Sequence, residues 1–220
     1  MTKNLDDIRT IVRNRGDFRN TVRFPNSVID TEIQAAFDEF YAMVVEANEG
    51  YYDTSTTTPT VAAQAYVALP SGVWIVRAID RLNGTEYDPL CRVGVKDRNR
   101  YGSTQSEPLA YRLTARGADL YPTPNAIYTL RITYTPVAPT LDSTQREFYN
   151  GWEEYAIFGA LLRLGGTERN DAPLWQRMLD AAAARVRREA PDRGSSEPEY
   201  LNLFGEGDGA DWDRPPTWSW

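Results

Sequence analysis

Residues 27–44 read SVIDTEIQAAFDEFYAMV, and apolar side chains recur in this stretch every three or four positions. This spacing places them on one face of an α-helix, with polar residues on the other face. Ser27 is a suitable N-cap, Asp30 stands three residues later in a capping-box-like position, and Gly50 follows the pattern. The sequence therefore predicts a long amphipathic helix that ends before Gly50 and buries Ile29, Ile33, Phe37, Phe40 and Val44.

A shorter helix is predicted before this one. Asn4 is a good cap, Asp6 and Asp7 suit the positive end of the helix dipole, and Gly16 is a plausible end. Its predicted buried residues, again at helical spacing, are Leu5, Ile8 and Val12.

The middle of the chain has the pattern of β-strands. Extended structure is expected over residues 54–60, 65–69 and 73–82, and Asn83-Gly84 predicts a two-residue hairpin turn. Residues 95–107 fit either a short helix or a long loop. Two further strands are predicted from strict alternation of apolar and polar residues, with Leu109, Tyr111 and Leu113 facing inward in one and Tyr128, Leu130, Ile132 and Tyr134 in the other.

Two helices are predicted after Pro136 and Pro139, which close the β region. The first begins near residue 144, is apolar around most of its circumference and stops at Gly165-Gly166, so it should be central. The last starts at Asp171 with Pro173 in its first turn. The predicted buried stripe of this last helix is Trp175, Met178, Leu179, Ala182 and Val186.

This order of elements predicts an α+β fold. A helical bundle domain formed by residues 1–50 and 141–190 is split by an antiparallel β insertion, residues 51–140, and is followed by an extended C-terminal arm, residues 191–220. A length of 220 residues suits one domain with an insertion. We recognise neither a membrane-spanning run nor a secretory leader.

The composition argues against several classes of enzyme. The chain has no His and a single Cys91, which removes Ser-His-Asp and Cys-His catalysis, His-ligated zinc and thiolate clusters. Its net charge of −7 disfavours tight binding of duplex DNA. We expect no catalytic residue, no metal site and no cofactor.

The remaining candidates for chemistry have simpler interpretations. Adjacent helical residues point about 100° apart, so the pairs Asp6-Asp7 and Glu153-Glu154 are expected to be solvated or to complement helix dipoles. Cys91 is expected to be half-buried and structural. A solvated helix end or a partner's acidic groups are the expected surroundings of Arg185, Arg187 and Arg188.

The arm at residues 191–220 is the most informative segment. It holds seven acidic and two basic residues, so five of the seven net negative charges lie there, together with three of the six Trp. A disordered, solubilising end is one interpretation. Because a purely solvating tail has no use for aromatic residues, we favour a partner-binding arm anchored by Tyr200, Leu201, Leu203, Phe204, Trp212, Trp218 and Trp220.

A succession of short motifs resembles a known family. The β region reads LPSGVWIVRAI at 69–79, YRL at 111–113, LYPTP at 120–124 and YTLRITY at 128–134, and it then returns to helix. Over roughly residues 5–190 this order is similar to the head-to-tail adaptor, or head completion, proteins of tailed bacteriophages, including the tail tubular A type. The arm has no counterpart that we can match residue by residue.

The resemblance implies a non-enzymatic component of the virion, made in the host cytoplasm. It implies a homo-oligomeric ring, typically of twelve copies, under the portal protein, with neck or tail proteins (nozzle or tail tube) attached below. DNA would pass through the channel without specific binding, along a neutral or negative wall, and no membrane partner is implied.

Two other functions stay open at this point. A β-rich module of a tail component would bind carbohydrate or a host surface through Trp74, Tyr87, Tyr101 and Tyr111, displayed in one exposed cleft. A carboxylate-based hydrolase would need two acids that converge in a pocket.

Overall fold

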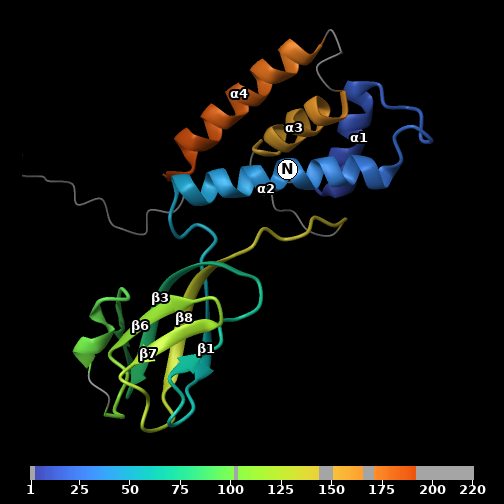
Figure 1. Cartoon of the computed structure of the whole chain (residues 1–220). Helices are drawn as coiled ribbons and strands as arrows, with labels where there is room; N and C mark the ends of the chain where they lie inside the picture. The colour runs from blue at the N-terminus through green and yellow to red at the C-terminus, as the bar shows by residue number, and fades with distance from the viewer. Residues whose placement is uncertain (1–2, 102–103, 144–150, 166–170, 192–220) are drawn as a thin grey trace, which may run out of the picture.

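The computed structural model describes residues 3–101, 104–143, 151–165 and 171–191 and has an α+β architecture. Four helices pack together, and two four-stranded sheets form a separate layer pair below them in Figure 1. The predicted fold class, α+β, is therefore confirmed. The predicted arm at residues 191–220 lies outside the described residues from position 192 onward.

Helix α1 (Leu5–Gly16) starts as its sequence predicts. The Asn4 side chain accepts a hydrogen bond from the Asp7 N–H at 2.9 Å, and the Asp7 carboxylate accepts one from the Asn4 N–H at 3.2 Å. At the other end, Asp17 takes the left-handed conformation. Gly16 is required there because a Cβ on it would lie 2.2 Å from the ring of Phe18, which folds back over the helix end.

Helix α2 (Asn26–Ala47) buries the predicted stripe completely, but its predicted cap is wrong. The helix begins before Ser27, with Pro25 at the N-cap and no side-chain cap. The reason is a long-range contact, since Arg13 donates to Asn26 Oδ1 at 2.6 Å and to the Phe24 carbonyl at 2.9 Å and so fixes the start of the helix. The Asp30 carboxylate does not form the predicted capping box and instead accepts a hydrogen bond from Arg9 Nε at 2.5 Å.

Helices α3 (Glu153–Gly165) and α4 (Ala172–Glu189) complete the helical layer. As predicted, α3 is central: it packs on the other three helices, and a Cβ on Gly159 would lie only 2.8 Å from Ala36 Cβ of α2. The predicted stripe of α4 is buried at Trp175, Ala182 and Val186. Met178 does not belong to it, being 40% exposed on the edge of the helix.

The first sheet has the strand order β1-β8-β3-β4, and all its neighbours are antiparallel. Its members are β1 (Thr54–Pro59), β3 (Val73–Asn83), β4 (Glu86–Pro89) and β8 (Thr129–Pro136). The alternation predicted for β8 is confirmed, because Leu130 and Ile132 are fully buried. The hairpin turn lies one residue later than predicted, at Gly84 and Thr85, since Asn83 still pairs with Glu86 and Gly84 has φ +63°.

The second sheet has the order β2-β7-β6-β5 and is not wholly antiparallel. It contains β2 (Tyr66–Val67), β5 (Cys91–Arg92), β6 (Ala110–Thr114) and β7 (Gly117–Tyr121). The β5–β6 pair is parallel because a long crossover, with the 3₁₀ helix η1 (Asp97–Tyr101), connects the two strands. Leu109, predicted to face inward, lies one residue before β6 and is 54% exposed, whereas Ala110 is buried.

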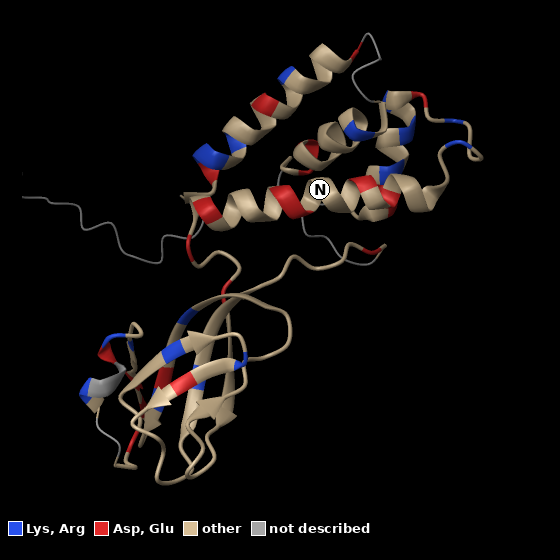
Figure 2. Ribbon diagram, viewed as in Figure 1, with Lys and Arg blue, Asp and Glu red and all other residues tan. Residues whose placement is uncertain are grey.

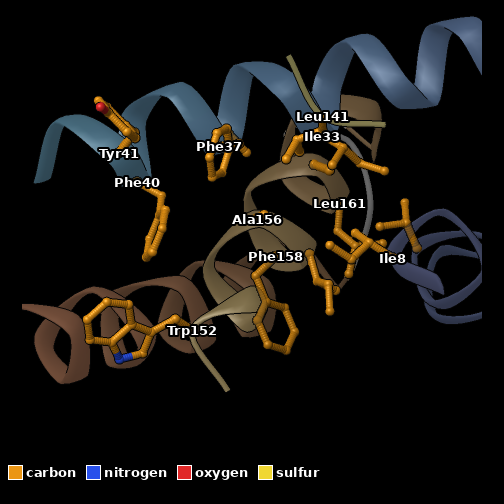
Figure 3. Packing of buried hydrophobic residues seen from close by; sticks show 14 of the residues in the cluster. Ile8, Ile33, Phe37, Phe40, Tyr41, Leu141, Trp152, Ala156, Phe158 and Leu161 are labelled. Atoms are coloured by element: carbon orange, nitrogen blue, oxygen red, sulfur yellow. The ribbon is translucent and has the colours of Figure 1, made fainter. Parts of the chain in front are cut away.

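Each layer has its own hydrophobic core. The helical core joins all four helices, and Figure 3 shows Phe40 of α2 above Trp152, with ring centroids 5.8 Å apart. The second core lies between the two sheets and centres on Ile79, Leu120, Leu130 and Ile132. Interaction surfaces must therefore come from the outer helix faces, the sheet edges and the junction between the layers.

Candidate interaction surfaces

The start of the C-terminal arm is fixed against the end of α2. Ala190 is fully buried, and its carbonyl accepts a hydrogen bond from Asn48 Nδ2 at 2.7 Å. Pro191 then lies in an open groove of about 380 Å³, together with Met43, Glu46, Ala47 and Arg187. The arm thus leaves the helical layer from a defined position. The predicted anchors Tyr200, Leu201, Leu203, Phe204, Trp212, Trp218 and Trp220 lie outside the described residues.

An aromatic contact joins the helices to the sheets. Tyr41 of α2 stacks on Tyr52 with ring centroids 4.2 Å apart, and its hydroxyl donates to the Pro136 carbonyl at 3.0 Å. Trp74 of β3 lies 6.0 Å from the same ring. Tyr41 is only 2% exposed. This one buried side chain therefore contacts both places where the chain passes between the helices and the sheets, at Tyr52 before β1 and at Pro136 at the end of β8.

A polar contact reinforces this junction. Thr135 Oγ1 donates to Asp53 at 2.6 Å and accepts from Arg77 Nε at 3.1 Å, and Arg77 lies 3.7 Å from Glu49. Asp53 and Glu49 lie in the connection from α2 to β1, and Arg77 and Thr135 lie in the two central strands of the first sheet, β3 and β8. The junction therefore carries two independent sets of contacts, one aromatic and one ionic.

An apolar groove opens beside the junction. It encloses about 290 Å³ between α2 and the start of the sheet and is lined by Asp38, Tyr41, Ala42, Trp74, Val137 and Ala138. Trp74 and Val137 remain 45% and 52% exposed. Such half-exposed apolar side chains are typical of contacts with another protein.

A second open groove, of about 490 Å³, lies between α1, α3 and α4. Its apolar lining includes Leu174 and Met178, which are 57% and 40% exposed, while Arg15, Glu154 and Asp171 supply its polar groups. The guanidinium of Arg15 lies 5.2 Å from the centre of the Phe158 ring. Glu154 lies in the first turn of α3, Asp171 is the N-cap residue of α4, and most of the lining of this groove is apolar.

The described residues contain no group of acidic, Cys or His side chains that could hold a metal ion. Across the same part of the chain, none of the helices has the length and apolar character needed to cross a membrane.

The model of the SU10 adaptor protein family matches residues 3–199, which is most of the chain. The chain belongs to the SU10 adaptor protein family. This is a family of structural phage adaptors, so the protein is an adaptor component of a virion that contacts other head and tail proteins. A search of curated proteins found no match to this sequence. All seven predicted anchors of the arm lie beyond residue 199 and therefore outside the matched range.

The aromatic residues of the rival binding module do not form one exposed cleft in the adaptor. Tyr111 is 2% exposed in the core between the sheets, and the ring of Tyr87 is covered by the Arg131 guanidinium, 4.0 Å from its centre. Tyr101 lies against Tyr121, and Trp74 belongs to the junction. This arrangement does not favour recognition of carbohydrate through these four side chains.

Two predictions about individual side chains are wrong in this adaptor. Cys91, expected to be half-buried, is exposed on β5 at the edge of the second sheet. Arg185 is not simply solvated, because it donates to Glu189 at 2.9 Å, and Glu189 also accepts from the indole N–H of Trp152 at 3.0 Å. Arg188 is exposed, as expected for a helix end.

Glu153 also departs from expectation. It opens α3, where its charge complements the dipole, but it is 3% exposed rather than solvated, and it pairs with Lys3. Burial by itself raises the pKa of this carboxyl, but the hydrogen bond and charge of Lys3, with backbone N–H groups, outweigh it and lower the pKa below its ordinary value. Sequence gives no signal for a partner 150 positions away.

We predict that Glu153→Gln makes the free energy of unfolding depend less on pH in the acid range. A carboxylate whose pKa is lowered by folding contributes stability above its unfolded pKa of about 4.5 and loses that contribution as pH falls through the lower folded value. The variant should be about 1–3 kcal/mol less stable than the wild type at pH 7, and this difference should shrink below pH 4.5. Urea unfolding at pH 7 and pH 3.5 measures both quantities.

Glu154→Gln is the matched control. Glu154 is the next residue along the chain, and among the residues that the structure describes its carboxylate forms no ion pair. An equal loss for Glu153→Gln at both pH values would show that the Lys3 pair does not contribute through charge.

Proposed function

We propose that this adaptor forms a ring of about twelve subunits beneath the portal vertex, extends the DNA channel and provides the attachment site for tail components. The observation that carries the proposal is the family match across residues 3–199. Exposed apolar grooves on a protein of this size are consistent with burial between subunits or against neighbouring proteins.

In this proposal the parts of the chain have different tasks. The helical unit, residues 1–50 and 141–190, forms the contacts around the ring, and the β insertion, residues 51–140, faces the next component. The arm, residues 191–220, docks on the portal or on neighbouring subunits through its aromatic and aliphatic anchors. The fixed start of the arm beside Asn48 supports this division, because it sets where the arm leaves the helices.

The charges suit a channel through which DNA slides. Twelve copies at −7 each would carry −84, of which the arms hold −60 and the helical and β parts hold −24; a wall of this sign repels the phosphate backbone. Three of the arginines that would oppose this are engaged within the chain: Arg13 holds the start of α2, Arg15 lies over Phe158, and Arg185 pairs with Glu189. We therefore propose a neutral or negative lumen. From the family match we also propose that the adaptor has no enzymatic activity.

Mass measurement of the full chain, alone and bound to isolated portal, tests the proposal. We expect about twelve copies per portal complex, whether or not the free protein is monomeric, since ring closure can require the portal as a template. Portal complexes that hold only one or two copies, or no copy, would contradict the ring. Turnover that is lost on changing Glu154 or Asp171 would contradict the absence of enzymatic activity.

A further inference from the structure

The outer face of α2 carries acidic and small residues at a regular spacing. Its exposed and half-buried side chains repeat at intervals of four and three positions, and α2 has no Lys or Arg at all. We call this row the α2 stripe. It consists of Val28, Glu32, Ala35, Glu39, Ala42 and Glu46.

The outer face of α4 has the same spacing and the opposite charge. We call this row the α4 stripe, and every member of it is exposed. Its two arginines stand eleven positions apart with two alanines between them, whereas the three glutamates of the α2 stripe stand seven positions apart. The α4 stripe consists of Leu174, Arg177, Ala181, Ala184 and Arg188.

The charges on both stripes are largely uncompensated within the chain. Among the residues that the structure describes, Glu32, Glu46 and Arg177 form no ion pair, and Arg188 reaches Glu189 only at 3.9 Å. Glu39 is the exception, since it meets Arg163 at 2.6 Å. In Figure 2 the charged segments of α2 are all red, whereas those of α4 are mostly blue with red ones among them.

The two stripes cannot satisfy each other in one subunit. Along most of their length both helices use their apolar faces on α3, so the stripes face away from the shared core, and α2 meets α4 directly only at their C-terminal ends, where Glu46 and Arg187 line one groove (Figure 1). The seven-residue repeat permits two helices to pack along their length at a shallow angle, and alanine permits a close approach. At 1.5 Å per residue the stripes span roughly 27 and 21 Å, so the α4 stripe fits within the length of the α2 stripe.

We infer that the α2 stripe of one adaptor subunit packs against the α4 stripe of the next. The occupant is a second copy of this chain, because one chain carries both halves of a contact that is opposite in charge and whose rows share the same alternation of three and four positions. Such a contact is heterologous and generates a closed ring when the rotation per subunit closes. This inference rests on the proposed ring and names the surface that builds it.

Charge reversal in the full chain tests the contact. Glu32→Lys with Glu46→Lys reverses the α2 stripe, and Arg177→Glu with Arg188→Glu reverses the α4 stripe. Each double variant alone should associate about tenfold more weakly than the wild type, because like charges then face each other at every contact. An equimolar mixture of the two should associate again, since every interface then pairs opposite charges. Glu86→Lys with Lys96→Glu, two exposed sites in the β layer, is the control.

Native mass spectrometry of the proteins, free and on isolated portal, gives the copy number, and circular dichroism checks folding. If the wild type forms rings and both charge-reversed variants form them equally well, the contact is overturned while the proposed ring stands. A wild type that forms no ring even on the portal would overturn the ring and the contact together. Variants that form normal rings but lose the portal would assign the stripes to the portal and overturn the contact between copies.

Discussion

Ending the chain after Pro191 should leave the adaptor folded but unable to remain on portal-bearing capsids. The truncation keeps the Asn48–Ala190 hydrogen bond and both hydrophobic cores, so the free energy of unfolding should stay within about 0.5 kcal/mol of the wild-type value. It removes all seven proposed anchors and five net negative charges. Sedimentation of capsids with bound adaptor, together with retention of packaged DNA, measures the loss.

A second arm variant separates apolar anchoring from charge. Replacing the seven anchors by Ser keeps the acids, and it should detach the adaptor as completely as the truncation does. Neutralising the seven acids of the arm while keeping the anchors should slow association without abolishing it. Normal completion of heads by the truncated chain would show that the arm is not the docking element. The anchors to be replaced are Tyr200, Leu201, Leu203, Phe204, Trp212, Trp218 and Trp220.

Trp152→Ala should cost about 3–5 kcal/mol of unfolding free energy. The indole is 1% exposed, lies 5.8 Å from the ring of Phe40 and 6.0 Å from that of Tyr51, and donates to Glu189. Removing it leaves a cavity among three helices and takes away one of the two hydrogen-bond donors to the half-buried Glu189 carboxylate that are described above. Denaturant unfolding followed by circular dichroism gives the value.

Trp74→Ala is the control of the same residue type, because Trp74 is 45% exposed at the junction groove. It should cost less than half as much, since much of its surface stays in water. A Trp152→Ala loss below 1 kcal/mol, or one no larger than that of Trp74→Ala, would contradict the central place of Trp152 in the core.

Local patterns were enough to predict most elements of the fold. The buried stripe of α2, the Asn4 cap and the alternation of β8 all depend on residues close together in the chain, so periodicity and capping chemistry determine them. The hairpin was predicted one residue too early because Asn-Gly and Gly-Thr turns both satisfy the local signal, and only strand register decides between them.

The errors have a common physical cause, which is contact between distant segments. Arg13 sets the start of α2 in place of Ser27, and Lys3 allows Glu153 to be buried as an ion. The parallel β5–β6 pair follows from a crossover whose path no local pattern specifies. At the candidate surfaces, charge and apolar content are readable from sequence, but the grooves at Trp74 and Leu174 exist only once helices and sheets pack.

The pairing of β1 with β8 has an evolutionary consequence. The chain enters the sheets through β1 and leaves through β8, and Thr54 faces Tyr134 across this antiparallel pair, where Cα atoms lie about 5 Å apart. A deletion that rejoins the chain at these two positions has only a short gap to bridge. Insertions or losses within the sheets therefore leave the ends of the helices in place. Selection can change the length and surface of the β layer while the helices keep their mutual spacing.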